Sequence, residues 1–208
     1  MEIDLKGIKN IIFDLGGVIL DLDFNASIRA FYKLGLKESV LNGKLRYSDK
    51  IFYQLQTGHV TPEKFRERVR EILKNSAITD QQIDDAWSAM LKGIPRQRIE
   101  TLGKLRKNFG IFLFSNTNTI HIDRLEKEFL DTNGFRFTSV FDGVYYSQDI
   151  GDAKPAVSSF LKVIELSGVV PQETLFVDDI VENILGAEKA GLKTFWLKDG
   201  MDIREVFG

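Results

Sequence analysis

Five polar side chains in this sequence follow apolar segments typical of buried strands, or lie on the loops after them. They are Asp14, Ser115, Lys154, Asp178 and Asp179. Parallel strands bring their carboxyl ends to one edge of a sheet, and the ligands of open α/β sheets collect at that edge. We therefore expect these carboxylate, hydroxyl and ammonium groups to meet at one site.

Such a set of groups is suited to phosphoryl transfer. Asp14 is the candidate nucleophile, because carboxylate attack on phosphorus gives an acyl phosphate and divides a difficult hydrolysis into two steps. A Mg²⁺ ion would offset the repulsion between this carboxylate and a phosphate, and Mg²⁺ prefers carboxylate, carbonyl and water ligands. Asp178 and Asp179 supply the further carboxylates.

The remaining groups are suited to binding the phosphate. Ser115 and Asn116 offer a hydroxyl group, an amide and backbone N–H donors, and Lys154 offers a positive charge to the transferring group and the nucleophile. Taken singly, each of these residues has an ordinary explanation as a helix cap, a turn residue or part of a surface loop. Their joint occurrence, in this order and each at a strand end, is what indicates a catalytic site.

The composition is that of a soluble globular protein. Apolar residues make up 43% and charged residues 28% of the 208 positions, which is ordinary. The net charge of −2 gives no reason to expect nucleic-acid binding. Without cysteines, and with two histidines, the chain has no disulfide, no thiolate metal site and no zinc site built from histidines alone. No signal-peptide pattern or membrane-spanning apolar run is visible, so we expect a cytoplasmic protein, monomeric or homodimeric.

Strand patterns alternate with helix patterns in most of the chain. Such alternation predicts an α/β fold with a parallel sheet covered by helices on both faces. The predicted strands are residues 8–15, 111–115, 143–146, 175–178 and 194–197. The predicted helices between them are residues 98–107, 156–166 and 181–190.

The stretch from residue 25 to residue 94 breaks this alternation. It has no strand pattern, and amphipathic helix patterns cover residues 26–34, 48–55, 62–73 and 80–91. Thr61 followed by Pro62 marks one helix start, and Thr79 with Asp80 marks the next. We therefore predict a core made of residues 1–20 and 96–208, and a four-helix cap domain of residues 21–95 inserted after the first strand.

The chain resembles the haloacid dehalogenase superfamily of phosphohydrolases. All four motifs of that superfamily have counterparts, at residues 13–18, 114–118, 151–155 and 176–183. The bacterial α-D-glucose-1-phosphate phosphatases are similar in further segments, at residues 21–24, 115–118 with His121, and 147–149. The resemblance covers nearly the whole chain, including the helical cap.

This resemblance implies a Rossmann-like sheet, a Mg²⁺ ion and an aspartyl-phosphate intermediate. It implies that Asp14 attacks and also binds Mg²⁺, that Gly16 lends its backbone carbonyl to the metal, and that Asp179 is the other protein ligand. Asp178 and Asn183 then have auxiliary roles around the metal.

Gly16 is a departure from the pattern of the superfamily. Most of its phosphatases have an aspartate there, which protonates the leaving group and then activates water. Such general acid–base help is typically worth about 10²–10⁴ in rate, so we expect a slower enzyme, a surrogate acid or a good leaving group. Asp21 and Asp23 are the nearest carboxylates, on one face if the segment is extended. Their alternative role is as polar hinge residues leading into the cap.

Four functions follow from these residues. The leading one is Mg²⁺-dependent hydrolysis of a small phosphorylated metabolite, such as the sugar phosphate glucose 1-phosphate. A metal-independent 2-haloacid dehalogenase also lacks the second aspartate, but it would not need the pair Asp178 and Asp179. A phosphosugar mutase needs the acid that Gly16 replaces. A non-catalytic phosphometabolite-binding protein would not need Asp14, Lys154 and Asp179 together.

Several aromatic residues are candidates for a substrate pocket. Tyr47, Tyr53 and His59 are suited to lining a sugar site, although Tyr53 also fits the core of the cap and His59 fits an exposed turn. His121 follows the second motif and either supports its loop, caps a helix or lies at the surface. Core packing is expected for Trp87, Met90 and Trp196.

Overall fold

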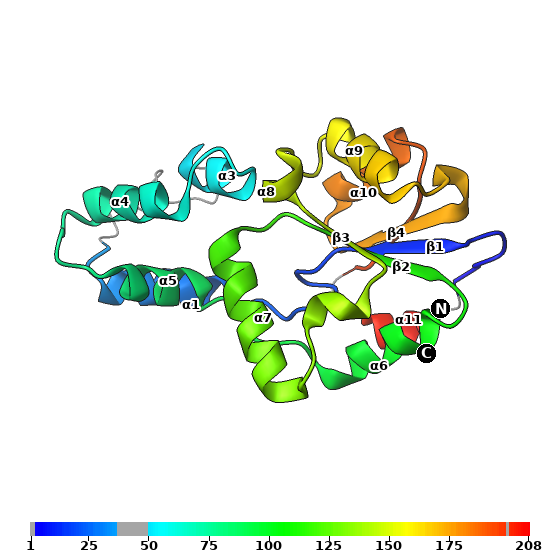
Figure 1. Cartoon of the computed structure of the whole chain (residues 1–208), viewed down its shortest axis with the longest axis horizontal. Helices are drawn as coiled ribbons and strands as arrows, with labels where there is room; N and C mark the ends of the chain where they lie inside the picture. Colours follow the sequence, from blue (N-terminus) through cyan, green and yellow to red (C-terminus); the bar gives the residue numbers. More distant parts are fainter. Residues whose placement is uncertain (1–2, 37–49, 199) are drawn as a thin grey trace.

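The computed structural model describes residues 3–36, 50–198 and 200–208. Its central element is a sheet of five parallel strands in the order β3-β2-β1-β4-β5 (Figure 1). These strands are β1 (Asn10–Phe13), β2 (Gly110–Ser115), β3 (Gly143–Tyr146), β4 (Thr174–Asp178) and β5 (Lys193–Trp196). The predicted α/β class with a parallel sheet is confirmed, and each predicted strand overlaps an observed one.

Helices cover both faces of this sheet. The strands of the centre are apolar on both sides, as parallel strands buried between helices must be. On one face Ile11 and Phe13 pack with α6 (Arg96–Leu105), α7 (Thr119–Asn133) and α11 (Ile203–Phe207). On the other face Ile12 packs with α9 (Val157–Ser167) and α10 (Val181–Lys189). Figure 1 shows these two groups of helices on opposite sides of the strands.

The strand register brings the expected site residues to one edge. Phe13, the last residue of β1, lies beside Leu113 of β2 and Val177 of β4. The chain therefore reaches Asp14 and Asp178 at the same level of neighbouring strands. A short helix, α8 (Ser147–Ile150), follows β3 at this edge.

A group of helices inserted after β1 lies beyond the sheet in Figure 1. We call α1 (Phe24–Lys33), α3 (Lys50–Gln56), α4 (Pro62–Leu73) and α5 (Asp80–Ser88) the helical insertion. They share an apolar core in which the ring of Phe52 lies 4.9 Å from Trp87 and 5.6 Å from Phe65. Thr61 and Thr79 cap α4 and α5 as expected. Each helix therefore buries one face within the insertion itself.

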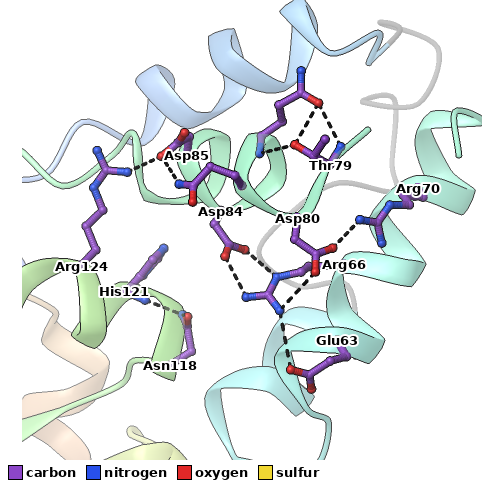
Figure 2. Close-up of polar contacts among 12 residues, drawn as sticks. Glu63, Arg66, Arg70, Thr79, Asp80, Asp84, Asp85, Asn118, His121 and Arg124 are labelled. Carbon is purple, nitrogen blue, oxygen red and sulfur yellow. Dashed lines mark hydrogen bonds and ion pairs between the residues drawn. The ribbon is translucent and has the colours of Figure 1, made fainter. Parts of the chain in front are cut away.

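Ion pairs join α4 to α5 on the outer side of this core. Arg66 donates two hydrogen bonds to the Asp84 carboxylate, at 2.9 and 2.7 Å, and Arg70 pairs with Asp80 (Figure 2). This two-pronged arginine–carboxylate geometry is the strong form of the contact. It holds α4 and α5 in one register.

The two connections between the helical insertion and the sheet run side by side. Asp21 N–H donates to Gly93 O at 3.1 Å, Lys92 N–H donates to Asp21 O at 2.9 Å, and Asp23 N–H donates to Met90 O at 2.9 Å. The boundaries of 21 and 95 predicted for a cap domain stay a prediction, and this pairing lies beside them. Among the described helices, none is long and apolar enough to cross a membrane.

Candidate active site

Lys154 and Asp14 form the centre of the site. The Lys154 ammonium lies 2.7 Å from Asp14 Oδ1, 2.7 Å from Asp178 Oδ2 and 3.1 Å from Phe114 O. It also lies over the rings of Phe114 and Phe176, 5.2 Å from each centroid. A buried ammonium with two carboxylates, a carbonyl and two ring faces around it is held in one position.

The charges at this centre shift one another's titration. Burial raises the pKa of Asp14 to about 7, with the Lys154 charge opposing the rise and the Asp178 charge adding to it. Burial alone would lower the pKa of Lys154, but the charges of Asp14 and Asp178 outweigh it and raise that pKa. The lysine therefore keeps its proton at neutral pH and offers a permanent positive charge beside Asp14.

Asp178 is fully buried, and both of its carboxylate oxygens accept hydrogen bonds from neighbouring residues. Its carboxylate accepts hydrogen bonds from Asn183 Nδ2, at 3.0 Å to each oxygen, from the Ile180 N–H at 2.8 Å, and from Lys154. The auxiliary roles predicted for Asp178 and Asn183 stay predictions. The geometry supports them, because these bonds fix Lys154 and the start of α10.

Asp179 lies against the backbone of the first loop. A Cβ atom added to Gly17 would be 2.2 Å from Asp179 Oδ2, so only a glycine leaves room for this carboxylate. Gly17 also has φ = +77°, a conformation that glycine adopts without strain. On the other side, the indole N–H of Trp196 donates to Asp179 O at 2.9 Å. Trp196 is 40% exposed, so the expectation that it is a core residue was wrong. The reason is that β5 is an edge strand, and the Trp196 side chain packs over the loop that follows β4.

The three acidic residues fit a hard divalent cation. Asp14, Asp178 and Asp179 each offer one carboxylate oxygen, and these oxygens lie within 4.8 Å of one another. An all-oxygen donor set is what Mg²⁺ selects. Because Asp178 is occupied by Lys154 and Asn183, Asp14 and Asp179 are the better ligands. Gly16 lies in the wall of the same cavity, and its role as a carbonyl ligand stays a prediction.

Ser115 and Asn116 lie at the end of β2, beside this centre. Both line the cavity. The Asn116 amide bonds the backbone of Lys154 in both directions, with Nδ2 donating to Lys154 O at 2.8 Å and Oδ1 accepting from its N–H at 3.0 Å. Its side chain therefore fixes the lysine loop rather than facing a phosphate. The phosphate contacts predicted for Ser115 and for the backbone N–H groups at Asn116 stay predictions.

The space beside Gly16 is filled by an apolar side chain. A Cβ at position 16 would lie 2.7 Å from Leu22 Cδ1. Leu22 and Gly16 both line the cavity. A side chain at position 16 would thus meet Leu22 unless that leucine moved.

Asp21 and Asp23 have different surroundings. Asp23 caps α1, accepting from the Ala26 N–H at 3.2 Å, and pairs with Arg29 at 2.8 Å. Asp21 lines the cavity, and its Oδ1 accepts from Arg98 at 2.8 Å. Their auxiliary roles in catalysis stay predictions, although Asp23 has the geometry of the hinge and capping alternative.

The site opens into a cavity of about 690 Å³ between the sheet edge and the helical insertion. One part of its wall is the charged centre described above. The other part is largely apolar, with a few polar groups. That part is lined by Leu20, Leu22, Phe24, Trp87, Met90, Leu91, Gln56, Thr117, His121 and Asp21.

His121 lies on this second part of the wall, in a contact that sequence reasoning missed. Its ring stacks on Trp87, with centroids 4.9 Å apart and planes 24° apart, and Nε2 lies 3.2 Å from Trp87 O. Its backbone N–H donates to Asn118, the cap of α7 (Figure 2). The sequence showed each residue, but no local pattern joins a histidine in the first turn of α7 to a tryptophan 34 positions away. The core role expected for Trp87 and Met90 agrees with their burial.

The other aromatic candidates lie elsewhere. Tyr53 is 52% exposed and does not line the cavity, so neither a sugar contact nor a core position describes it. His59 is exposed and bonds Thr57 Oγ1 through Nδ1 at 2.7 Å, which agrees with the exposed turn. Tyr47 lies outside the described residues.

A second contact joins the helical insertion to the sheet edge. The Ser147 hydroxyl donates to Gln56 O at 2.5 Å and accepts from the Thr117 N–H at 3.0 Å. Gly58 packs on the same segment, where a Cβ would lie 2.4 Å from Gln148 O. The cavity is thus bounded on two sides by contacts between the insertion and the sheet.

Known proteins resemble this chain over most of its length. A family model described as haloacid dehalogenase-like hydrolase matches residues 8–191. A D-ribitol-5-phosphate phosphatase of Bacteroides thetaiotaomicron is 32% identical over 198 residues, covering 95% of this chain and 96% of that protein.

Solved structures agree. A haloacid dehalogenase family enzyme of Bacteroides thetaiotaomicron, in complex with magnesium and inorganic phosphate, is 35% identical with a TM-score of 0.82, over 93% of this chain and 96% of that one. A haloacid dehalogenase-like family hydrolase of Porphyromonas gingivalis is 35% identical with a TM-score of 0.83, over 93% and 92%.

Proposed function

Because the chain belongs to the haloacid dehalogenase-like hydrolases, we propose that it is a Mg²⁺-dependent phosphatase that acts through an aspartyl-phosphate on Asp14. The observation that carries the proposal is the buried Lys154 ammonium, 2.7 Å from both Asp14 and Asp178, beside the third carboxylate of Asp179. Neither a structural ion pair nor a dinucleotide site needs this grouping. The sequence-based expectation of a hydrolase of this superfamily is confirmed, and the placement beside glucose-1-phosphate phosphatases stays a prediction.

The chemistry assigned to the chain's own residues has two steps. In the first, an Asp14 oxygen forms a bond to phosphorus while the bond to the ester oxygen breaks, and that oxygen takes a proton from solvent water to leave as the alcohol. In the second, water attacks the same phosphorus and gives up a proton to solvent, and Asp14 leaves as a carboxylate. Lys154 balances the negative charge at Asp14 and on the phosphoryl oxygens throughout, and Ser115 donates a hydrogen bond to one of these oxygens.

Asp14 and Asp179 would hold the Mg²⁺ ion, with the carbonyl oxygen of Gly16 as the predicted third protein ligand. The bound ion supplies positive charge that offsets the repulsion between carboxylate and phosphate. Support comes from the cradle that Gly17 leaves for Asp179 and from the all-oxygen donor set. The related enzyme bound to magnesium and phosphate supports the same assignment.

The substrate is proposed to be a small phosphorylated polyol or sugar. The cavity of about 690 Å³ is of the size that takes a small metabolite. The ribitol-5-phosphate specificity in the name of a relative that shares 32% identity supports a polyol phosphate, while glucose 1-phosphate is the sugar phosphate predicted from sequence. Monomeric or homodimeric state and a cytoplasmic location stay predictions.

Phosphate release from a panel of phosphorylated polyols and sugars, with and without Mg²⁺, tests this function. We expect Mg²⁺-dependent release by the wild type, its loss on addition of EDTA, and its loss in Asp14→Asn, whose amide cannot attack. Asp131→Asn, at an exposed carboxylate paired with Lys127 outside the cavity, is the matched control and should retain activity. Turnover by Asp14→Asn contradicts the nucleophile, and halide release from a 2-haloacid without metal contradicts the phosphatase.

A further inference from the structure

The hydrogen bond between His121 and the Trp87 carbonyl determines where the imidazole carries its proton. Nε2 lies 3.2 Å from Trp87 O. A carbonyl oxygen can only accept a hydrogen bond, so Nε2 must be the protonated nitrogen. The stacked Trp87 ring, 4.9 Å away, holds the imidazole in this orientation.

The other ring nitrogen is consequently an acceptor. Burial lowers the pKa of His121 to about 4, and the bond to Trp87 O opposes this only in part. The ring is therefore neutral at physiological pH, and Nδ1 has a lone pair and no hydrogen. Within residues 3–36, 50–198 and 200–208, no hydrogen bond reaches Nδ1. The ring geometry directs this lone pair away from the Trp87 carbonyl.

His121 lines the mostly apolar part of the cavity wall. The same part of the wall includes Leu22, Phe24 and Met90, whose side chains offer no strong hydrogen-bond donor. The carboxylate of Asp21, another acceptor on this part, already takes a hydrogen bond from Arg98. An acceptor among hydrocarbon side chains favours a ligand that brings a hydroxyl group, since an unpaired polar group costs free energy on burial.

We propose that Nδ1 of His121 accepts a hydrogen bond from a hydroxyl group of the substrate, and that His121 thereby selects polyhydroxylated phosphate monoesters over phosphates with a plain hydrocarbon chain. The inference rests on the proposed phosphatase function and deepens it. His121 touches the substrate away from the phosphate and takes no part in bond breaking.

A pair of substrates with five carbons each tests this selection. Ribitol 5-phosphate carries hydroxyl groups along the chain, and n-pentyl phosphate carries none. The measured quantity is the ratio of their kcat/KM values in the Mg²⁺-loaded wild-type protein. We expect ribitol 5-phosphate to be preferred by about 10-fold or more, since a site built around a hydroxyl group discriminates against the analogue that lacks it. A wild type that prefers n-pentyl phosphate overturns the inference whether or not any variant folds.

His121→Gln then assigns the preference to His121. Its amide NH₂ can replace Nε2–H as the donor to Trp87 O. Its amide oxygen lies at the same far end of the side chain, so no acceptor remains at the position of Nδ1. We expect the ratio to fall by about 10- to 100-fold, the loss of one hydrogen bond to a buried partner. The matched control is Asp85→Asn, which weakens the Asp85–Arg124 pair between α5 and α7, 2.5 Å long in the structure (Figure 2). This control disturbs the same helix contact and should keep the wild-type ratio.

Each outcome is decisive. A ratio that falls in His121→Gln and not in Asp85→Asn supports the inference. Equal losses on both substrates in His121→Gln show that the histidine is only structural and overturn it, while phosphate release by the wild type leaves the proposed function standing. Absence of phosphate release from both substrates and from the wider panel overturns both.

Discussion

Leu22 packs against Gly16 at the place where a side chain at position 16 would begin. The distance from the ideal Cβ position to Leu22 Cδ1 is 2.7 Å. The obstacle is the end of a flexible side chain, and Gly16 does not have a positive φ. Placing an acid at position 16 therefore depends on two residues, because Leu22 would have to move or be made smaller to leave room for the new side chain.

Gly16→Asp combined with Leu22→Ala should add a proton donor to the site. We expect kcat on an alkyl phosphate to rise by at least about 10-fold, because general acid catalysis is typically worth about 10²–10⁴. We expect little gain on p-nitrophenyl phosphate, whose leaving group needs no proton. Steady-state kinetics on both substrates measures this. Gly16→Asn with Leu22→Ala is the control, and an equal gain on both substrates would contradict the explanation.

Gly17→Ala should weaken Mg²⁺ binding, while its loss of stability should be no larger than that of a control glycine. The new methyl group would meet Asp179 Oδ2 at 2.2 Å and displace the carboxylate. Gly7→Ala is a matched control, because Gly7 has the same φ of +77° and no atom within 4 Å of its Cβ position. We expect both variants to lose about 1 kcal/mol from strain at positive φ. Only Gly17→Ala should need at least about 10-fold more Mg²⁺ for half-maximal activity, and a similar requirement in Gly7→Ala would show that the methyl contact is irrelevant.

Lys154→Met should inactivate the protein and lower its stability. It leaves the carboxylates of Asp14 and Asp178 buried without their cation, a loss of about 3–5 kcal/mol in the free energy of unfolding. The pKa of Asp14 is raised from 3.8 to about 7 already in the wild type. The folded state therefore binds more protons than the unfolded state between these values, and stability falls as pH rises through that window.

Urea denaturation of metal-free protein at several pH values measures this effect. The fall should continue to higher pH and be larger in total in Lys154→Met than in the wild type, because the Lys154 charge that opposed the rise in the pKa of Asp14 is gone. Lys162→Met, at a half-exposed lysine, should cost less than about 1 kcal/mol. A loss of that size in Lys154→Met as well would be evidence against the buried ion pair.

His121 should make stability rise with pH between about 4 and 6.5. Its pKa falls from 6.5 to about 4 on folding, so the unfolded state binds the proton first as pH is lowered. The free energy of unfolding therefore falls by about 3 kcal/mol in all as pH is lowered from 6.5 to 4. The difference in unfolding free energy between wild type and His121→Gln should show this slope. His59→Gln, at an exposed histidine, is the control, and two identical pH profiles for wild type and His121→Gln would rule out the buried neutral ring.

The sheet and the charged centre were predictable from sequence because both depend on local patterns. Apolar runs on both faces predict buried parallel strands, and the ends of such strands meet at one edge. Asp14, Lys154 and Asp178 could therefore be placed together without knowing the strand order. The cap at Thr79 was predictable for the same reason, since a cap is a contact between near neighbours.

The contacts that shape the cavity were not predictable in this way. Asn116 turns its amide to Lys154, 38 residues away, and Leu22 reaches Gly16 across a loop. The stacking of His121 on Trp87 joins two separately packed groups of helices. A single sequence records none of these distances, since each depends on how the helical insertion lies against the sheet. The exposure of Trp196 was missed for a related reason, because an apolar strand pattern does not tell an edge strand from a central one.

The two tryptophans of the chain contact different residues of the site. Trp87 is buried against His121, and Trp196 is part-exposed with its N–H on the backbone of Asp179. Indole fluorescence responds to solvent exposure and to nearby charges. The protein therefore contains two built-in optical reporters, with Trp196 beside Asp179, the proposed metal ligand, and Trp87 beside His121, the proposed substrate contact. Replacing either one by phenylalanine leaves the signal of the other, so metal and substrate binding can be followed separately without an added dye.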